Sequence, residues 1–163
     1  MKIRAAELQD AEAIRAIYNL EVLESTVTFD IVARTLEQQQ EWIELRSGVH
    51  PAIVVEDDLG EIAGFGSLSQ YRDRAAYSTS VEDSVYVRRD TQGRGIGKMI
   101  LNDLVERATA HGFHAVFARI AGDHETSISL HQRCGFEIVG HEREVGRKFG
   151  KWLDVILMER LLG

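Results

Sequence analysis

The chain has 163 residues, of which 44% are hydrophobic and 28% are charged, and its formal net charge is −7. This size and composition predict one globular domain spanning residues 1–163. The acidic balance argues against a nucleic-acid partner, and no apolar run approaches the roughly 20 residues of a membrane span. With a single cysteine, Cys134, and no apolar leader, we expect a cytoplasmic protein without an intrachain disulfide.

Short elements fill the first half of the chain. Ala11, Ile14, Ile17 and Val22 recur at helical spacing behind Asp10, a residue type that caps helices. The other segments are predicted, in chain order, as a strand at 3–5, a helix at 36–45, a strand at 52–55, a turn at 57–60, and strands at 62–68 and 80–87. The turn between the strands at 52–55 and 62–68 indicates an antiparallel hairpin.

Helices and strands alternate in the second half. Ile96, Ile100, Leu104 and Ala108 share one face of a strong helix, which ends at His111–Gly112. The segments after it are predicted as a strand at 115–120, a helix at 125–133, and strands at 136–140 and 152–158. This order indicates an α/β (α+β) domain in which helices flank a single central, mostly antiparallel mixed sheet.

Three glycines lie within five residues in Gln92-Gly93-Arg94-Gly95-Ile96-Gly97, between a strand and the strong helix. Unpaired amides and the dipole at a helix start attract anions, and glycines let the backbone approach a diphosphate closely. The turn lacks the Gly-Lys-Ser/Thr ending of a nucleotide P-loop. Taken alone, it also fits a tight turn that only packs a helix on a strand. The basic residues around it are Arg88, Arg89, Arg94 and Lys98.

The turn matches the pattern Gln/Arg-x-x-Gly-x-Gly/Ala of the coenzyme A loop in the GCN5-related N-acetyltransferases (GNAT), which this chain resembles. Further segments resemble the phosphinothricin and methionine-sulfoximine acetyltransferase branch: Ile17–Asn19, Ser25–Phe29, Arg72–Tyr77, Val81–Glu82, Leu130–His131, Cys134–Phe136 and Gly150–Val155. The resemblance implies the GNAT fold, acetyl-coenzyme A as co-substrate and no metal. It places the coenzyme against Val85, Tyr86, Val87, Gln92, Gly93, Arg94, Gly95, Ile96, Gly97, Lys98 and His124, the last replacing an asparagine usual in the branch.

The implied reaction is direct attack of an amine on the thioester, which needs a base, an oxyanion donor and help for the leaving thiolate. The resemblance makes Glu82 the candidate base and His131 the candidate group at the leaving-group end, with backbone amides near 85–87 as oxyanion donors. Each side chain has a structural alternative: Glu82 as a strand carboxylate paired with an arginine, and His131 as a buried hydrogen-bonding residue. Nothing near Cys134 lowers the pKa of its thiol, so we do not expect an acetyl-cysteine intermediate.

Arg72 and Arg74 are candidates to grip an anionic group of the acceptor, although a solvated charged loop is the simpler alternative. The resemblance adds the other expected acceptor-site residues: Phe29, Asp73, Tyr77, Glu82, Asp83 and Ser84. The implied acceptor is the α-amine of a small amino acid or analogue such as phosphinothricin or methionine sulfoximine. The segment around Trp152 resembles the part of the branch that closes a homodimer.

Two further hypotheses stay open on the sequence alone. A protein or peptide N-acetyltransferase would need an open groove. The positive charges of Arg72 and Arg74 argue against a groove that binds lysine-rich peptides. A non-catalytic acyl-coenzyme A-binding module would keep the Gln92–Gly97 turn without needing Glu82 and His131.

Overall fold

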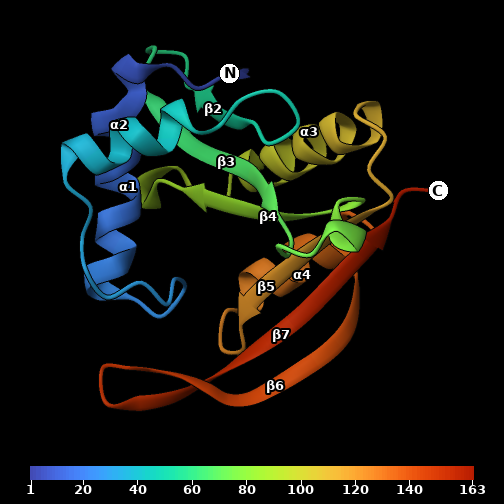
Figure 1. Ribbon diagram of the computed structural model, residues 1–163. Helices are drawn as coiled ribbons and strands as arrows, with labels where there is room; N and C mark the ends of the chain where they lie inside the picture. Colours follow the sequence, from blue (N-terminus) through green and yellow to red (C-terminus); the bar gives the residue numbers. More distant parts are fainter.

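The computed structural model describes all residues, 1–163, as one seven-stranded sheet flanked by four α-helices (Figure 1). Its elements are β1 Lys2–Ala5, α1 Ala11–Glu24, α2 Leu36–Glu44, β2 Ala52–Glu56, β3 Ile62–Gln70, β4 Ser80–Val87, α3 Ile96–Ala110, β5 Ala115–Ala121, α4 Glu125–Arg133, β6 Glu137–Lys148 and β7 Lys151–Leu161. None of the helices is long and apolar enough to cross a bilayer.

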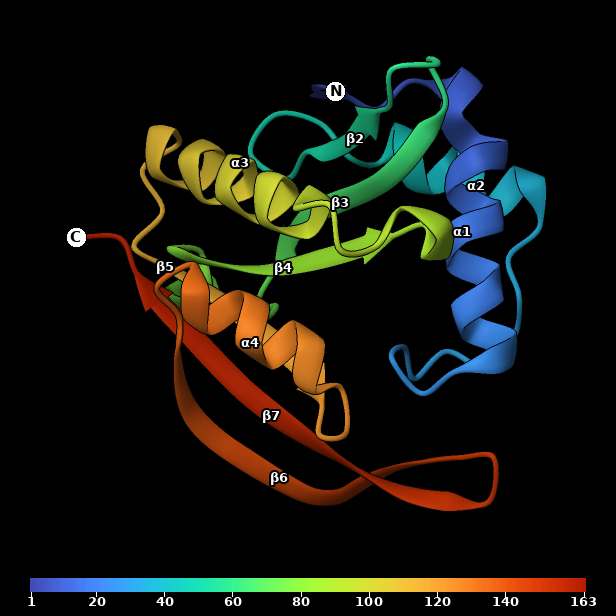
Figure 2. The same cartoon turned by 180° about the vertical axis from the view of Figure 1, so that it is seen from behind.

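The strands are ordered β1-β2-β3-β4-β5-β7-β6, and every neighbouring pair is antiparallel except β4–β5. Helices α1 and α2 cover one face of the sheet, and α3 and α4 cover the opposite face (Figures 1 and 2). The expected mixed, mostly antiparallel sheet is therefore confirmed.

Helix α3 packs closely on β3 because β3 has glycines beneath it. A Cβ added to Gly66 would lie 2.4 Å from Cγ2 of Ile100, and one added to Gly64 would lie 3.0 Å from Cδ1 of the same residue. Ile100 and Leu104 are fully buried there. The predicted apolar face of α3 is thus the face that forms the larger core, which supports the glycine turn at the start of the helix.

Two helix starts differ in how they are capped. Thr35 and Gln38 form a capping box at α2, with Oγ1 of Thr35 accepting from the Gln38 amide at 3.1 Å. Asp10 occupies the N-cap position of α1, as expected, but its side chain makes no hydrogen bond to the start of the helix. Its carboxylate accepts two bonds from Arg4, at 2.8 and 2.9 Å, because this buried group takes the stronger charged partner.

The closing strands are longer than the sequence pattern predicted. β6 and β7 form a hairpin whose apolar alternation is broken by register shifts between Ile138 and Gly140 and between Glu142 and Gly146. Such irregularities turn the following side chains to the other face of the sheet. The alternation of apolar and polar residues therefore stops before the strand does, and the pattern predicts too short a strand.

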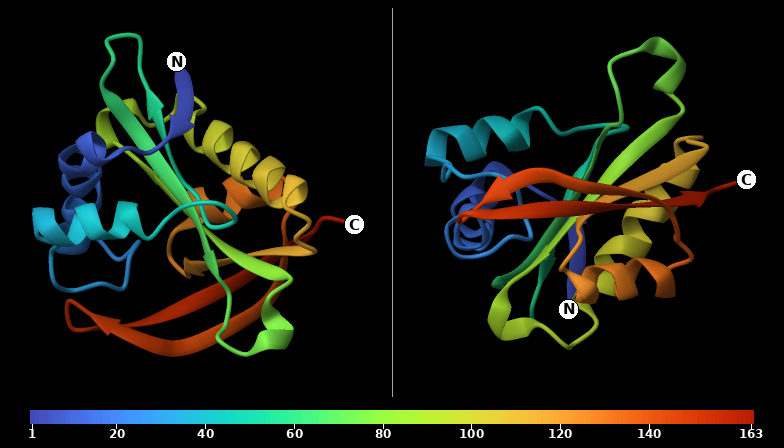
Figure 3. Two further views of the ribbon diagram at one scale, coloured as in Figure 1. Left: turned by 45° about the horizontal axis from the view of Figure 1, so that its top comes forward. Right: turned by 90° about the horizontal axis from the view of Figure 1, so that it is seen from below.

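The tip of this hairpin reaches the loop that follows α1 (Figure 3). Nζ of the buried Lys148 donates to the carbonyl of Thr28 at 2.8 Å and lies 3.4 Å from the carbonyl of Glu21. The ring of Phe29 lies over Gly146, where an added Cβ would approach Cε2 to 2.5 Å. The loop after α1 and the tip of the β6–β7 hairpin, which are far apart in sequence, therefore contact each other.

Candidate active site

The sheet opens between its two parallel strands. β4 and β5 pair only at residues 80–82 with 115–117, although β4 continues to Val87 and β5 to Ala121. Beyond Glu82 and Phe117 the strands diverge (Figure 2). This leaves a gap that passes between the α1/α2 face and the α3/α4 face.

Backbone groups of β4 point into this gap. The amide of Arg88 donates to the carbonyl of Ala63 on β3 at 2.8 Å. Because hydrogen bonds alternate along an antiparallel pair, the amides of Val85 and Val87 point away from β3, toward the missing β5 partner. These two amides have no strand partner on that side and are available to donate to a ligand in the gap.

The glycine turn forms the start of α3. Gly93 and Gly95 both have φ of +81°, a conformation that other residues adopt only with strain. The first helical bond runs from the Met99 amide to the Gly95 carbonyl, so the amides of residues 96–98 have no partner within the helix. An added Cβ on Gly97 would lie 3.1 Å from Cδ2 of Leu130, so this glycine lets α4 approach.

A cavity of about 260 Å³ lies in front of these amides. It is lined by Val85, Val87, Gln92, Gly93, Gly95, Ile96, Gly97, Lys98, His124, Thr126, Ser127, Leu130 and Arg133. The open helix start, the free strand amides and this cavity fit the diphosphate and the extended arm of coenzyme A. Tyr86 can contribute only its main chain, because its ring stacks on Phe65 on the opposite face, with ring centroids 5.2 Å apart.

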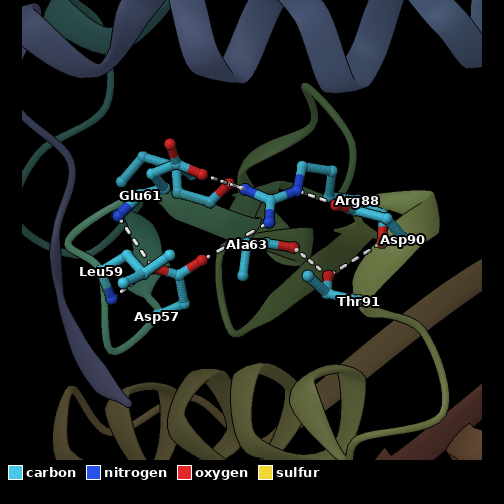
Figure 4. A network of polar contacts seen from close by, with 8 residues as sticks. Asp57, Leu59, Glu61, Ala63, Arg88, Asp90 and Thr91 are labelled. Carbon is cyan, nitrogen blue, oxygen red and sulfur yellow. Dashed lines mark hydrogen bonds and ion pairs between the residues drawn. The ribbon is translucent and has the colours of Figure 1, made fainter.

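Two of the four basic residues expected near the phosphates are engaged elsewhere. Arg88 bonds Asp90 at 2.6 Å and Asp57 at 3.4 Å, and Oγ1 of Thr91 donates to the Ala63 carbonyl at 3.1 Å (Figure 4). Arg89 pairs with two carboxylates on α1. These contacts engage both guanidinium groups and anchor the turn to its surroundings.

Positive charge without an ion-pair partner remains at Arg94, Lys98 and Arg133. Lys98 and Arg133 line the cavity, whereas Arg94 is exposed beside it. Sequence reasoning missed Arg133, because only the approach of α4 to the turn brings it there.

A smaller cavity of about 120 Å³ occupies the gap itself. Its lining comes from both faces: Glu21, Val27, Asp83, Ser84, Val85, Tyr86, Val87, Gln92, Ala118, Arg119, Ile120, His124, Ser127 and His131. It shares Val85, Val87, Gln92, His124 and Ser127 with the larger cavity. A ligand held at the glycine turn can therefore reach through the sheet toward the α1/α2 face.

Glu82 lies at the last pair of β4 and β5, opposite Phe117. Its carboxylate is half-buried and accepts no hydrogen bond from the protein. Burial raises the pKa of this group, although the positive charge of Arg119 opposes the shift. A carboxylate with a raised pKa and free oxygens has the properties of a general base.

Asp83 lies on the opposite face of β4 from Glu82, and its side chain is buried. Its Oδ1 and Oδ2 lie 3.0 and 3.1 Å from Nε2 of His131, whose Nδ1 lies 2.8 Å from the Ser127 carbonyl. Burial alone would lower the pKa of His131, but the charge and hydrogen bonds of Asp83 raise it above its usual value. Asp83, expected at the acceptor, instead holds the expected leaving-group residue.

His124 stands at the N-terminus of α4 and lines both cavities. Burial lowers the pKa of its ring, with partial compensation from Asp123 and Glu21. A neutral imidazole here keeps one donor and one acceptor for the coenzyme arm. Cys134 is buried, and burial raises the pKa of its thiol, which does not favour a nucleophilic thiolate.

The residues expected around the acceptor lie at different distances from the gap. Ser84 lines it, whereas Arg72, Asp73, Arg74 and Tyr77 are exposed in the loop before β4. The guanidinium of Arg72 lies 4.9 Å from the ring centroid of Tyr71. Phe29 lies beside the hairpin tip and lines a separate surface hollow.

Two features of this side were not foreseen. Tyr71 stacks on Phe117 with ring centroids 4.4 Å apart, and Tyr77 packs edge-on against Tyr71 at 5.7 Å. Arg119 on β5 lines the gap and pairs with Glu142 on β6. No local motif marks these residues. The alternation within 115–120 could have placed Phe117 and Arg119 on one face, but only the strand pairing puts that face beside Glu82.

The sequence profile described as "Acetyltransferase (GNAT) domain" matches residues 3–157. An L-methionine sulfoximine/L-methionine sulfone acetyltransferase of Pseudomonas aeruginosa is 40% identical over 158 residues, which cover 96% of this chain and 92% of that protein.

Two solved structures agree with the fold. The phosphinothricin acetyltransferase of Sinorhizobium meliloti in complex with acetyl-coenzyme A is 37% identical with a TM-score of 0.95, over 99% of this chain and 88% of that one. The ribosomal-protein-alanine N-acetyltransferase of Brucella melitensis is 35% identical with a TM-score of 0.96, over 99% and 100%.

An opened mixed sheet with a glycine turn at its gap defines an acyl-coenzyme A-dependent transferase. The chain belongs to the GNAT family and is an N-acetyltransferase that uses acetyl-coenzyme A as co-substrate. The alternative of a non-catalytic binding module is therefore wrong, and the expectation of an enzyme is confirmed.

Proposed function

We propose that the acceptor is the α-amine of a small amino acid or analogue, such as methionine sulfoximine or phosphinothricin, and that Glu82 is the base. The observation that carries the proposal is the position of a free, half-buried carboxylate at the point where the sheet opens. Arginines lie near this carboxylate, and the relatives are named for amino-acid analogues, all of which carry an α-carboxylate that an arginine can bind.

In the proposed reaction, Glu82 takes a proton from the acceptor ammonium, directly or through one water. The amine nitrogen then bonds the thioester carbon, and the carbon–sulfur bond breaks with its electron pair going to sulfur. The second proton, which the nitrogen loses as it becomes an amide, goes to the departing thiolate. In the tetrahedral intermediate the former carbonyl oxygen of the thioester is negatively charged, and the amides of Val85 and Val87 donate hydrogen bonds to it. These amides need no reorganisation, because β4 already holds them in the gap.

His131 supports departure of the thiolate through its charge. Both ring nitrogens are engaged, by Asp83 and by the Ser127 carbonyl, and the side chain is almost fully buried. The protonated ring lines the gap from the α4 side and favours negative charge there. We therefore propose that His131 acts as a held cation and not as a freely exchanging acid.

Thiol release from acetyl-coenzyme A tests this function. The assay would compare L-methionine sulfoximine and L-phosphinothricin with peptides that carry an N-terminal alanine. Release with the amino-acid analogues and none with the peptides is expected. Faster turnover of the peptides would reject the small-molecule assignment.

A protein N-terminal acetyltransferase is the second candidate, favoured by the name of the Brucella structure. The approach of the hairpin tip to the loop after α1 argues against it. The bond from Lys148 to Thr28 and the packing of Phe29 on Gly146 hold the tip against this loop, which leaves less room for a polypeptide between the two segments.

We also propose that the β6–β7 hairpin mediates a homodimer. Phe149 and Trp152 at its tip expose 56% and 61% of their surfaces, which is typical of interface anchors. Light scattering of the purified protein would be expected to give twice the chain mass. A Trp152→Glu variant should shift it to the mass of one chain, and an unchanged mass would contradict the proposed interface.

A further inference from the structure

Arg119 is placed by strand pairing on the acceptor side of the gap. Phe117 pairs with Glu82 in the last rung between β5 and β4, and Arg119 follows two residues later. Side chains two apart in a strand share a face, so Arg119 projects on the same face as Glu82. Unlike Arg72 and Arg74, it lines the gap cavity together with Ser84.

The guanidinium of Arg119 is held but not saturated. One nitrogen, Nη2, bonds Oε1 of Glu142 on β6, and no other hydrogen-bond partner meets it. Its side chain is 28% exposed. A guanidinium carries five N–H donors, so most of them remain available on a group whose direction is fixed by the neighbouring strand.

The chemistry of an α-amino acid ties this position to the base. The amine and the carboxylate are bonded to the same carbon, so the cation that receives the carboxylate must lie close to the group that receives the amine proton. The positive charge of Arg119 opposes the rise in the pKa of Glu82 that burial causes, and that of Arg72 does so more weakly, in keeping with the pairing that places Arg119 near the base.

We propose that Arg119 binds the α-carboxylate of the acceptor, through the guanidinium donors that Glu142 leaves free. This inference rests on the proposed function and assigns its carboxylate subsite to a strand residue. Arg72, farther out on the loop and lying over Tyr71, is then left for a second anionic group on the acceptor side chain.

The experiment compares each acceptor with its α-carboxamide, using L-methionine sulfone and L-methionine sulfone amide on wild type and Arg119→Gln. Loss of charge-assisted bonds to the carboxylate should lower kcat/KM for the acid by about 10- to 100-fold, mainly through KM. The amide should change by less than about threefold, because it carries no charge for the guanidinium to bind. Arg119→Lys should recover part of the loss, and Arg119→Gln should leave the KM for acetyl-coenzyme A unchanged.

Two further variants separate binding from a structural role. Glu142→Gln removes the strand-to-strand pair but keeps the guanidinium, so the preference for the acid should persist. Arg107→Gln removes a control arginine on α3 that is likewise paired with a carboxylate, that of Asp103 at 2.5 Å. It should change kcat/KM for neither the acid nor the amide.

Equal losses on the acid and the amide in Arg119→Gln, or the same losses in Glu142→Gln, would overturn the carboxylate assignment. A wild-type enzyme that turns over both acceptors equally would overturn it as well. If wild type acetylates no amino acid or amide, the proposed function itself fails, which is a distinct result seen without any variant.

Discussion

Asp83 and His131 hold a proton between them on the α4 side of the gap. Nδ1 of His131 lies 2.8 Å from the Ser127 carbonyl, which can only accept, so Nδ1 carries a hydrogen. Nε2 faces Asp83 at 3.0 Å, and a second proton must lie between them. Without it, an ionised carboxylate would face a nitrogen lone pair. The ring of His131 is therefore a cation held by the carboxylate of Asp83, and it resists losing that proton.

This pairing predicts a pH-dependent stability. The raised pKa of His131 gives a contribution that is complete below the unfolded value of about 6.5 and is lost as pH rises through the folded pKa. Asp83→Asn should therefore lower the free energy of unfolding by about 1–3 kcal/mol near pH 6, and by less near pH 9.5. Urea unfolding at the two pH values measures the difference.

The protein offers a matched control for this test. His141 also contacts an aspartate, with Nε2 2.8 Å from Oδ2 of Asp154, but its side chain is half exposed. Solvent screens such a pair, so His141→Gln should change stability little at either pH. A loss in Asp83→Asn that is the same at pH 6 and pH 9.5 would contradict a shared proton.

Glu82→Gln should lower kcat by about 10²- to 10⁴-fold, the usual contribution of a general base, with little change in the KM for acetyl-coenzyme A. Only the ionised carboxylate can accept a proton, and burial raises its pKa. Wild-type kcat/KM should therefore rise with pH through a limb that lies above the ordinary glutamate value of about 4.3. This limb should be absent in Glu82→Gln.

Steady-state kinetics across pH measure both effects, with the exposed Glu106→Gln on α3 as control. If Glu82→Gln turned over at the wild-type rate, Glu82 would not be the base, and the amine would have to lose its proton to solvent.

The sequence predicted the donor side of the site better than the acceptor side. The glycine turn and α3 are continuous in the chain, so the local pattern placed Gly93 and Gly95 at the start of the helix, and the family resemblance added the coenzyme. The neighbours of Glu82 depend on which strands pair and where pairing stops. Arg119 and Phe117 reach it from β5, and Asp83 turns away because successive side chains alternate. No local signal contains that information.

The glycine turn gives a prediction about coenzyme binding. Gly95→Ala would place a side chain at φ of +81°, which costs about 1–2 kcal/mol and displaces the amides that follow. We expect the KM for acetyl-coenzyme A to rise about tenfold, the effect of one weakened bond to a phosphate.

Gly60 is a matched control, because its φ is +80° and, as at Gly95, an added Cβ meets nothing within 4 Å. It lies in the β2–β3 turn, so Gly60→Ala should lose similar stability and keep the same KM for acetyl-coenzyme A. Thermal unfolding and steady-state kinetics on both variants separate the two effects. Equal changes in KM would show that backbone strain acts through stability alone.

The contact between Phe29 and Gly146 predicts that the hairpin sets the shape of the acceptor side. Gly146→Ala would place a Cβ 2.5 Å from Cε2 of Phe29 and force the half-exposed ring to move. We expect the KM for the amino-acid acceptor to rise about 5- to 10-fold, the usual effect of a small misfit in a pocket, and the KM for acetyl-coenzyme A to stay constant. In Gly140→Ala, a Cβ on the same strand would meet Leu157 at an ordinary 3.5 Å, so neither constant should change. An acceptor KM that is unaffected by Gly146→Ala would place Phe29 outside the acceptor site and would leave the specificity of the pocket to Glu82, Arg119 and the loop before β4.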